Sequence, residues 1–289
     1  PSGSVVHRFE DYDYSVIALC FSDDGKYLLT LGGDSSRQFF WFDISTGGVV
    51  NSGHMDRIAA KFLTSGGWTR DVKNRITDEY LFASCGSNSL VVWTGTSPVP
   101  TSVSLGRLVR DFTCCVFACN FLLAGSTSGH IVCVRSEKIV SETLISGNNT
   151  SCASLNNCVL FGASDGVVSF FTISVQEGFA KSCCKRIPFG PNPIHSLSSR
   201  EKFLAVSSLD GFISLLTLGV SNLDDVSPVS IDVVPASGIV DILKSGSSFF
   251  TLSSTNLARW SIEGICQEIV YSSPQSILCG TSNSLLSII

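Results

Sequence analysis

Apolar and polar positions along the chain form a repeating unit of two short β-prone runs around a tight polar turn. The clearest copy spans residues 25–43, GKYLLTLGGDSSRQFFWFD, with apolar runs at 27–31 and 38–42. The turn between them contains Gly32-Gly33-Asp34, residue types that tolerate the positive φ of a chain reversal. This pattern predicts a β-hairpin.

The same unit recurs further along the chain. Its copies lie at 80–94, 121–134, 158–173, 203–218, 249–262 and, in a shorter form, 276–289. Each copy has small or turn-forming residues between two apolar runs. The equivalent position near the end of each second run is held by Trp41, Trp93, Val134, Phe171, Leu216 and Trp260. These positions are 52, 41, 37, 45 and 44 residues apart, and a four-stranded propeller blade repeats every ~40–45 residues.

Further strands flank the first hairpin and complete a blade. An apolar run at 15–21 precedes it, and a short strand at Val49 follows it. Both faces of such a small sheet are apolar, so each face must pack on a neighbour, and closure into a ring satisfies this requirement. We therefore expect an all-β fold with almost no helix. The predicted architecture is a β-propeller of four-stranded antiparallel blades, about seven in number and incomplete at its ends.

The repeat also predicts the division of the chain. Residues 1–262 are assigned to the propeller, and its first blade is partial because the β-prone run at 3–9 has no partner before it. That run would serve as the outer strand of a blade. Residues 263–289 follow Trp260 too closely to hold four full strands. They are predicted to be a last irregular blade or the start of a second propeller.

Composition and charge narrow the class of protein. The chain is 44% hydrophobic and only 15% charged, which argues against disorder. Its net charge is −5, so the basic footprint of a nucleic-acid-binding protein is missing. Most of the 12 cysteines lie inside apolar runs, where a free thiol acts as a small hydrophobe. This usage indicates a reducing, intracellular compartment, and the N-x-Ser/Thr patterns at Asn148 and Asn149 are then expected to be coincidental.

Several apparent motifs have simpler explanations. Residues 162–166, GASDG, match the nucleophile elbow, but a β-prone run follows where that motif needs a helix. Cys114-Cys115 and Cys183-Cys184 lack the C-x-x-C spacing of zinc sites. The four histidines are scattered, and His54 after Gly53 is expected to support a turn. The weakly charged stretch 112–125 is too short to span a membrane as a helix. We expect no enzyme, no catalytic residue, no cofactor, no metal and no small-molecule substrate.

One segment departs from the repeat. An insert at 64–78, TSGGWTRDVKNRITD, lengthens the second blade and carries Trp68, Arg70, Lys73 and Arg75 on a predicted loop. An exposed tryptophan with flanking arginines is typical of the residues that dominate protein interfaces. This loop is our candidate protein-interaction site. The alternative is a solvated loop with Trp68 folded back onto its own blade.

The repeats resemble the WD40-repeat family, in a degenerate form. Only Trp41 is followed within two residues by an aspartate, Asp43. Particular stretches are similar to successive blades of the cilia- and flagella-associated tandem-propeller WD-repeat family. They are residues 15–43, 81–93, 106–115 with 122–134, and 239–260. Order and spacing agree over roughly residues 5–262. The echinoderm microtubule-associated-protein-like family is the nearest rival.

The resemblance implies a non-enzymatic, microtubule-associated scaffold. In that family the protein lies inside the doublet microtubules of the ciliary or flagellar axoneme, where it binds tubulin and neighbouring proteins. The implied location is the cytoplasm, cytoskeleton and cilium, without nucleic-acid or membrane partners. The alternative is a generic WD-repeat adaptor in a nuclear-pore, ubiquitin-ligase or trafficking complex, since one propeller fold hosts many functions.

Overall fold

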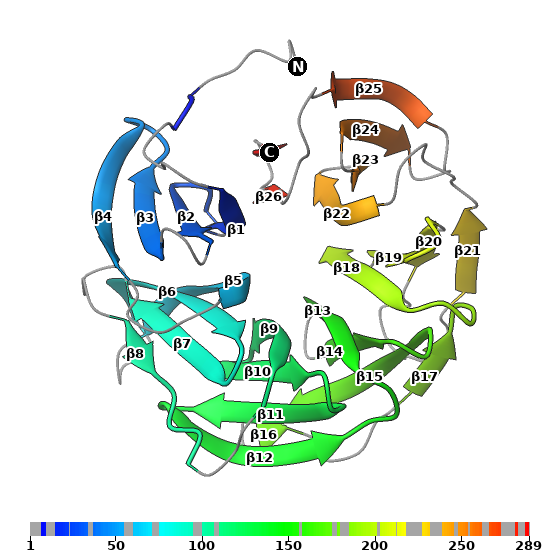
Figure 1. Cartoon of the computed structure of the whole chain (residues 1–289), viewed down its shortest axis with the longest axis horizontal. Helices are drawn as coiled ribbons and strands as arrows, with labels where there is room; N and C mark the ends of the chain where they lie inside the picture. The colour runs from blue at the N-terminus through cyan, green and yellow to red at the C-terminus, as the bar shows by residue number, and fades with distance from the viewer. Residues whose placement is uncertain are drawn as a thin grey trace.

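The chain folds as a β-propeller, in which small antiparallel sheets are arranged around a central axis (Figure 1). The structure is a computed structural model. It describes residues 7–9, 15–22, 24–33, 37–54, 60–70, 75–94, 100–106, 110–155, 158–174, 178–179, 185–200, 203–211, 213–217, 227–231, 239–245, 248–253, 255–261, 266–272, 281–282 and 287–288. These residues contain strands and turns and no helix. The expected all-β class is confirmed.

Six sheets of four main strands, blades 1 to 6, follow one another along the described chain. Blade 1 contains β1 (Val16–Phe21), β2 (Tyr27–Gly32), β3 (Gln38–Asp43) and β4 (Gly48–His54). Blade 2 contains β5 (Ala60–Arg70), β6 (Ile76–Gly86), β7 (Ser89–Thr94) and β8 (Thr101–Ser102). Blade 3 contains β9 (Phe112–Ala118), β10 (Phe121–Ser126), β11 (His130–Arg135) and β12 (Lys138–Leu144).

The second half of the chain continues the series. Blade 4 contains β13 (Asn149–Leu155), β14 (Cys158–Ala163), β15 (Val167–Ser174) and β17 (Lys185–Pro188), with the short β16 (Gly178–Phe179) also paired to β15. Blade 5 contains β18 (Ile194–Arg200), β19 (Phe203–Ser208), β20 (Ile213–Thr217) and β21 (Ser227–Ile231). Blade 6 contains β22 (Ile239–Ser245), β23 (Ser248–Ser253), β24 (Asn256–Ser261) and β25 (Cys266–Ser272). A two-stranded sheet, β26 (Thr281–Ser282) with β27 (Ser287–Ile288), places β26 beside β1 and β22.

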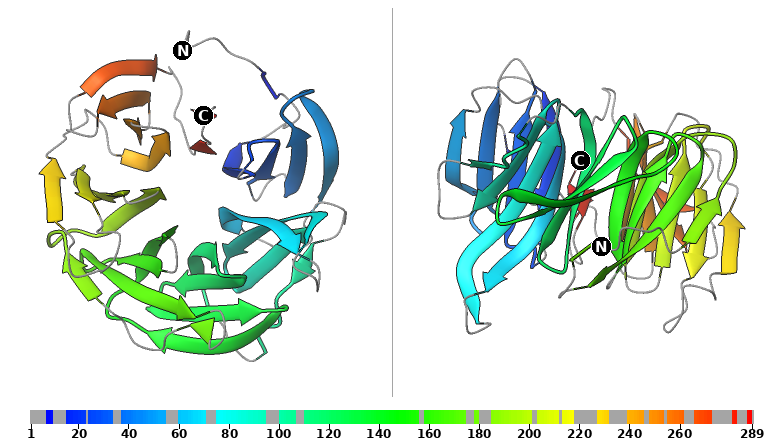
Figure 2. Two further views of the ribbon diagram at one scale, coloured as in Figure 1. Left: turned by 180° about the vertical axis from the view of Figure 1, so that it is seen from behind. Right: turned by 90° about the horizontal axis from the view of Figure 1, so that it is seen from below.

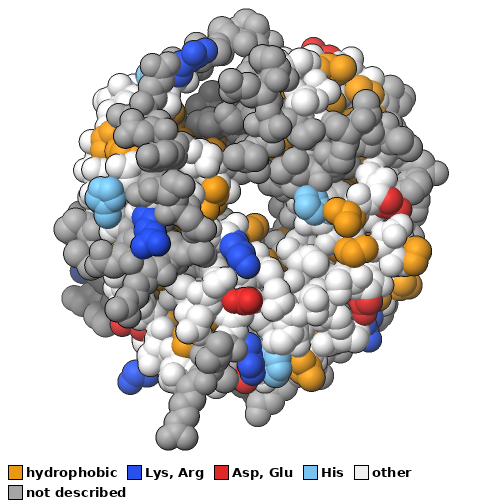
Figure 3. All heavy atoms as spheres, viewed as in Figure 1, with side chains coloured by type: hydrophobic (Ala, Val, Ile, Leu, Met, Phe, Trp, Pro, Cys, Tyr) orange, Lys and Arg blue, Asp and Glu red, His pale blue; other side chains and the backbone are white. Residues whose placement is uncertain are grey.

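The six predicted hairpins between residues 25 and 262 are the second and third strands of blades 1 to 6, whereas the short copy at 276–289 contains the two-stranded sheet of β26 and β27. The strands run from the axis outward in chain order (Figures 1 and 2), and the ring encloses a central opening (Figure 3). The six equivalent positions used to measure the repeat, from Trp41 to Trp260, all lie on third strands. Their partners on the second strands are, in order, Leu29, Phe82, Leu122, Val159, Leu204 and Phe249. The 44-residue spacing therefore reports one structural position repeated around the ring.

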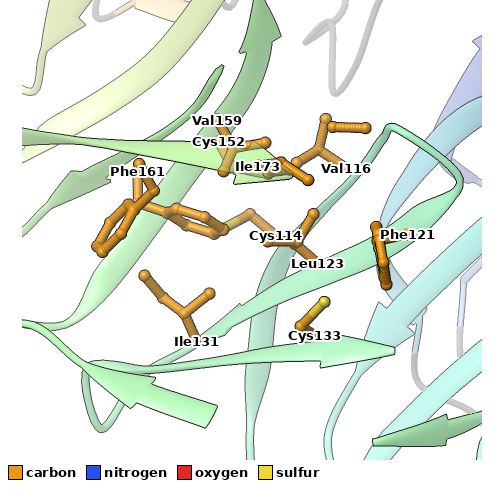
Figure 4. Close-up of a cluster of buried hydrophobic side chains, with 12 residues drawn as sticks. Cys114, Val116, Phe121, Leu123, Ile131, Cys133, Cys152, Val159, Phe161 and Ile173 are labelled. Carbon is orange, nitrogen blue, oxygen red and sulfur yellow. The ribbon is translucent and has the colours of Figure 1, made fainter. Parts of the chain in front are cut away.

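Apolar side chains fill the spaces between neighbouring blades. One core cluster joins blade 3 to blade 4 and contains Phe121, Leu123, Phe161 and Phe171 (Figure 4). Others join blade 1 to blade 2, blade 2 to blade 3 and blade 4 to blade 5. Blades 2, 3 and 4 thus bury both faces against their neighbours, as a propeller requires.

Every blade begins with the same β-bulge. The pairing of the first strand with the second shifts by one residue near its start, for example between Asn149 and Ser151. Equivalent shifts occur in the five other blades. In blades 4 and 5 the residue before the bulge fits against a glycine of the preceding blade. A Cβ at Gly125 would lie 2.8 Å from Asn149, and a Cβ at Gly162 would lie 2.5 Å from Ile194. Glycine at these positions allows adjacent blades to approach closely.

In blades 4 and 5, an aspartate in the turn between the second and third strands binds the link that leads into the blade. Ser146, in the link before blade 4, donates to Asp165 at 2.9 Å. One blade later, Asn192 donates to Asp210 at 2.5 Å. Arg186 adds an ion pair to Asp165, with Nη2 and Oδ2 3.3 Å apart. The GASDG segment is therefore a hairpin turn, as the β-prone run after it indicates.

Two tryptophans are paired with hydroxyl groups across a hairpin. Trp93 Nε1 donates to Ser84 Oγ at 3.0 Å, and Trp260 Nε1 donates to Thr251 Oγ1 at 2.9 Å. Trp93 pairs with Phe82 and Trp260 pairs with Phe249. The hydroxyl belongs in each case to the residue two positions later on that strand. The blades that lack the tryptophan have Ala124, Phe161 or Val206 at the hydroxyl position. In blades 2 to 6 the indole and its acceptor thus occur together or are both replaced by apolar residues, whereas blade 1 has Trp41 with Leu31 at the hydroxyl position.

Several local expectations need correction or stay untested. Gly33 does not have positive φ, and its N–H instead bonds Ser15 O at 3.0 Å. In the run at 3–9, only His7 to Phe9 is described, without strand pairing, and Phe9 packs on Phe42 with ring centroids 4.3 Å apart. β25 pairs with β24, so residues 266–272 complete blade 6. Whether residues 276–289 begin a second propeller stays a prediction.

Candidate functional site

The second blade contains a β-hairpin that is longer than its equivalents. β5 and β6 have eleven residues each, whereas the other first and second strands have six or seven. The insert at 64–78 was expected to be a loop, and this is wrong where the structure describes it. Trp68 pairs with Tyr80 and Arg70 pairs with Ile76, so both strands continue to residues 70 and 76. In the right-hand view of Figure 2 this cyan hairpin reaches past its neighbours.

Two glycines shape the base of this hairpin. Gly67 has a φ of +78°, the left-handed conformation that favours glycine, and lies at a register shift after Ser65. A Cβ at Gly66 would lie 2.8 Å from the ring of Phe117 in β9 and 2.9 Å from Leu81. The Gly-Gly pair looks like a turn in the sequence, but it forms a bulge against which blade 3 packs closely.

Trp68 folds back onto the propeller and does not extend into solvent. Its ring packs edge-to-face on Tyr80 at 5.1 Å and on Tyr27 of blade 1 at 6.3 Å. Further contacts of Tyr27 with Trp41 (6.1 Å), Trp41 with Phe82 (4.8 Å) and Phe82 with Tyr80 (5.0 Å) close a circuit of five aromatic rings. Such edge contacts add to the free energy of burial. The hairpin is therefore fixed to blades 1 and 2 together.

A carboxylate in the first turn of blade 1 binds the indole of Trp68. Trp68 Nε1 donates to Asp24 Oδ2 at 3.2 Å, and Ser22 Oγ donates to Asp24 Oδ1 at 2.6 Å. The N–H of Lys26 also donates to Oδ1, at 3.0 Å. Partial burial by itself would raise the pKa of Asp24, but these hydrogen bonds and the charge of Lys26 outweigh it and hold the pKa below its ordinary value of 3.8.

The lowered pKa of Asp24 predicts a pH-dependent contribution to stability. A group with a depressed folded-state pKa stabilises the fold above its unfolded-state pKa, near 3.8, and loses this effect as pH falls through the folded-state value. We expect Asp24→Asn to lower the free energy of unfolding by roughly 1 kcal/mol at neutral pH. Urea unfolding of both proteins between neutral and strongly acid pH measures the difference.

The difference between wild type and Asp24→Asn should shrink towards zero at the acid end of this range. Trp68→Phe is the matched variant, because it keeps an aromatic ring and removes the N–H donor. It should lose a smaller part of the same pH-dependent stabilisation. A difference between wild type and Asp24→Asn that stays constant down to the lowest pH would contradict the assignment.

The structure describes the four candidate residues to different extents. Trp68 lies in β5 with the contacts given above, and Arg70 ends that strand. Arg75 is exposed immediately before β6, next to Ile76, whose exposure is 62%. Lys73 and the side chain of Arg70 lie outside the described residues. No local pattern identifies Asp24 or Tyr27 as partners of the insert, because they belong to a different blade.

The cysteine pairs, His54 and Asn149 were the other residues considered for chemistry in the sequence. Cys114 and Cys115 are fully buried in β9, and Cys183-Cys184 lies outside the described part of the chain. His54 is exposed at the end of β4 opposite Gln38, and its expected support of a turn stays a prediction. Asn149 is 1% exposed, and its Nδ2 donates to Ser126 O and His130 O, so its amide is engaged.

Metal-binding clusters and membrane-spanning helices are both missing from the described residues. No group of three or more His, Cys, Asp or Glu side chains among them is placed to hold a metal ion. No helix in the same part of the chain is long and apolar enough to cross a membrane. The extended hairpin remains the segment of the described structure that departs most clearly from the repeated blade.

Comparison with known proteins gives one informative similarity. The chain matches no protein-family model. It is similar to the Cilia- and flagella-associated protein 52 of Chlamydomonas reinhardtii, with 25% identity over 180 residues. The match covers 57% of this chain and 28% of the relative, so the chain spans less than a third of that protein's length. The relative is, by its name, a protein associated with cilia and flagella.

Proposed function

We propose that this protein is a non-enzymatic structural scaffold of the cilium or flagellum. The observation that carries the proposal is the similarity over 180 residues to a cilia- and flagella-associated protein. The propeller supports it, because a ring of rigid blades offers several protein-binding surfaces on one small domain. The finer proposal is an axonemal role, in which the protein binds tubulin and neighbouring proteins inside the doublet microtubule.

The extended β5–β6 hairpin is the proposed contact element. It is fixed at its base by Trp68, so its two strands lose little conformational entropy when the hairpin meets a partner. Its tip carries Arg70, Lys73 and Arg75 in the sequence. Tubulin is acidic, and this chain has a net charge of −5, so contact requires a local group of cations. The hairpin provides such a group.

Charge reversal at the hairpin tip tests this assignment. We expect Arg70→Glu, Lys73→Glu and Arg75→Glu together to weaken binding to stabilised microtubules roughly tenfold or more, since like charges across an interface are costly. Co-sedimentation at low and moderate ionic strength measures the affinity. The matched control reverses Arg135, Lys138 and Lys185, which changes the net charge equally on strands of blades 3 and 4 that are not part of the hairpin.

Equal loss of binding in both triple variants would show a general charge effect and contradict the contact assignment. The wider proposal is tested separately, by the location of the tagged full protein in ciliated cells and by affinity purification. Enrichment along the axoneme with recovery of tubulin is the expected result. A diffuse cytosolic distribution, or recovery of ligase, coat or nuclear-pore subunits, would overturn it in favour of the adaptor alternative.

A further inference from the structure

Each innermost strand contains one residue that the β-bulge leaves outside the pairing with the second strand. In blades 1 to 6 these bulged residues are Ile17, Lys61, Thr113, Thr150, His195 and Val240. Each blade has four antiparallel main strands, so every innermost strand runs in the same direction and has its bulge at the same end. The six positions therefore form a ring at one mouth of the central opening.

The exposure of the bulged residues indicates where their side chains point. An innermost strand is covered along one edge by the second strand and on its faces by the innermost strands of neighbouring blades. Its other edge borders the opening (Figure 1). His195 is partly exposed between the buried Ile194 and Ser196, and Lys61 is exposed directly after the buried Ala60. Because a bulge redirects a side chain, these two residues are exposed at the opening and its mouth.

Lys61 and His195 offer nitrogen donors at this mouth, whereas the two threonines are engaged. Thr113 Oγ1 donates to a carbonyl of the next blade at 2.8 Å, and Thr150 Oγ1 donates to one of its own blade at 3.0 Å. Within the described residues, no hydrogen bond or ion pair engages the ammonium of Lys61 or the ring of His195. β5 and β18 lie on opposite sides of the opening (Figure 1), and Figure 3 shows a Lys or Arg side chain and a histidine at its rim. Both groups can donate to carboxylates.

An exposed apolar patch adjoins His195. Leu209 directly follows β19, and its exposure is 61%. Its N–H donates to Pro193 O at 3.0 Å, which places it beside the link into β18, two residues before His195. Pro193 is partly exposed and Pro191 is exposed in the same link, and proline restricts the backbone of this link before any partner binds. An extended segment at the mouth can therefore place an apolar side chain on Leu209.

Two aspartates on this face are bound within the protein, and a third limits where a ligand can lie. Asp165 pairs with Arg186, and Asp210 accepts a hydrogen bond from Asn192. Asp111 is exposed immediately before β9 and repels acidic groups over blade 3. The charges at the mouth therefore favour a ligand whose carboxylates lie over blades 2 and 5.

We propose that this mouth of the central opening binds an extended acidic segment of a partner protein. Its carboxylates pair with Lys61 and accept a hydrogen bond from the His195 ring, and an apolar side chain beside them packs on Leu209. The site lies at the start of β5, whereas the tip of the extended hairpin lies beyond the other end of that strand. The inference therefore does not depend on the proposed ciliary role.

A labelled acidic peptide tests this site. The probe is a fluorescein-labelled heptapeptide with one central leucine and six glutamates, and fluorescence anisotropy with the full protein at low ionic strength measures its affinity. Lys61→Gln and His195→Ala should each weaken binding roughly fivefold, and Leu209→Ser roughly threefold. Asp111→Asn should strengthen binding. Lys138→Gln, the matched control, removes one charge from the exposed outer strand β12 and should leave the affinity unchanged.

Two further measurements locate the peptide on the wild-type protein. With photoreactive benzoylphenylalanine in place of the leucine, cross-links to Pro193 or Leu209 are expected. A peptide with glutamine in place of glutamate should bind at least roughly tenfold more weakly, and equal binding would rule out carboxylate recognition. Cross-links to residues 64–78, with binding lost in the hairpin triple variant and kept in Lys61→Gln, would assign the peptide to the hairpin tip and overturn the proposal. Absence of binding at millimolar peptide would also overturn it.

Discussion

Replacing Trp41 by alanine should lower the free energy of unfolding by about 3–5 kcal/mol, the range for a buried tryptophan. Trp41 is 2% exposed on the third strand of blade 1. Its ring contacts Phe82 of blade 2 at 4.8 Å and an interplanar angle of 88°. Alanine would leave a cavity between two blades whose remaining side chains are held by their strands. A single domain is stable by only ~5–15 kcal/mol, so this is a large fraction.

Chemical denaturation followed by circular dichroism measures this loss. Val50→Ala, in the outer strand of the same blade, is the control, because Val50 is 52% exposed and the substitution should change stability by no more than about 0.5 kcal/mol. Trp41 also closes the circuit of aromatic rings at the extended hairpin. Hydrogen exchange in β5 and β6 should therefore increase in Trp41→Ala. A loss of stability equal to that of Val50→Ala would show that the blade 1–blade 2 interface is not packed as described.

Gly166→Ala should be the most damaging substitution of a single turn residue, with a loss of roughly 3 kcal/mol or more in the free energy of unfolding. Gly166 has a φ of +75°, and a Cβ at this position would lie 2.0 Å from Gly190 O. The obstacle is a backbone carbonyl, so no side-chain rotation can relieve it. The turn would have to move, and the bond from the N–H of Phe189 to Gly166 O, 2.9 Å, would be lost.

Gly106→Ala is the matched control for this effect. Gly106 also has positive φ, +59°, but among the described residues a Cβ there would meet no atom within 4 Å. The control should therefore cost only the strain of a left-handed alanine, about 1–2 kcal/mol. Thermal or urea unfolding of both variants measures the two losses. Similar values would mean that the strain dominates and that the close contact with Gly190 relaxes at little cost.

The repeated hairpins could be predicted from the sequence because their signals are local. Two apolar runs around a Gly, Asp or Ser turn lie within about 16 residues, and in blades 1 to 6 these runs are the second and third strands. The outer strands have weaker signals. In β4, for example, Gly48, Val49 and Val50 are all exposed, so neither alternation nor a continuous apolar run marks the strand.

The extended hairpin shows why local patterns were insufficient at the candidate site. Gly66-Gly67 lies in the insert at 64–78, which the sequence predicts to be a loop, and glycine pairs usually mark reversals. Here Gly66 accommodates Phe117 of another blade, 51 residues later in the chain. Likewise, the partner of Trp68 is Asp24, 44 residues earlier. Contacts of this kind depend on the ring closing, and no window of neighbouring residues contains them.

In each tryptophan–hydroxyl pair, substitution of one partner alone costs stability, whichever partner is replaced first. If Ser84 or Thr251 were lost first, the N–H of Trp93 or Trp260 would lose its acceptor, and an unsatisfied buried donor costs about 1–3 kcal/mol. Loss of the tryptophan first would leave the hydroxyl without its donor. A blade therefore passes between its polar and apolar forms through a less stable intermediate. Blade 1, with Trp41 and Leu31, has the composition expected halfway along that path. Decay of a repeat therefore costs stability in each blade where only one member of the pair has been lost.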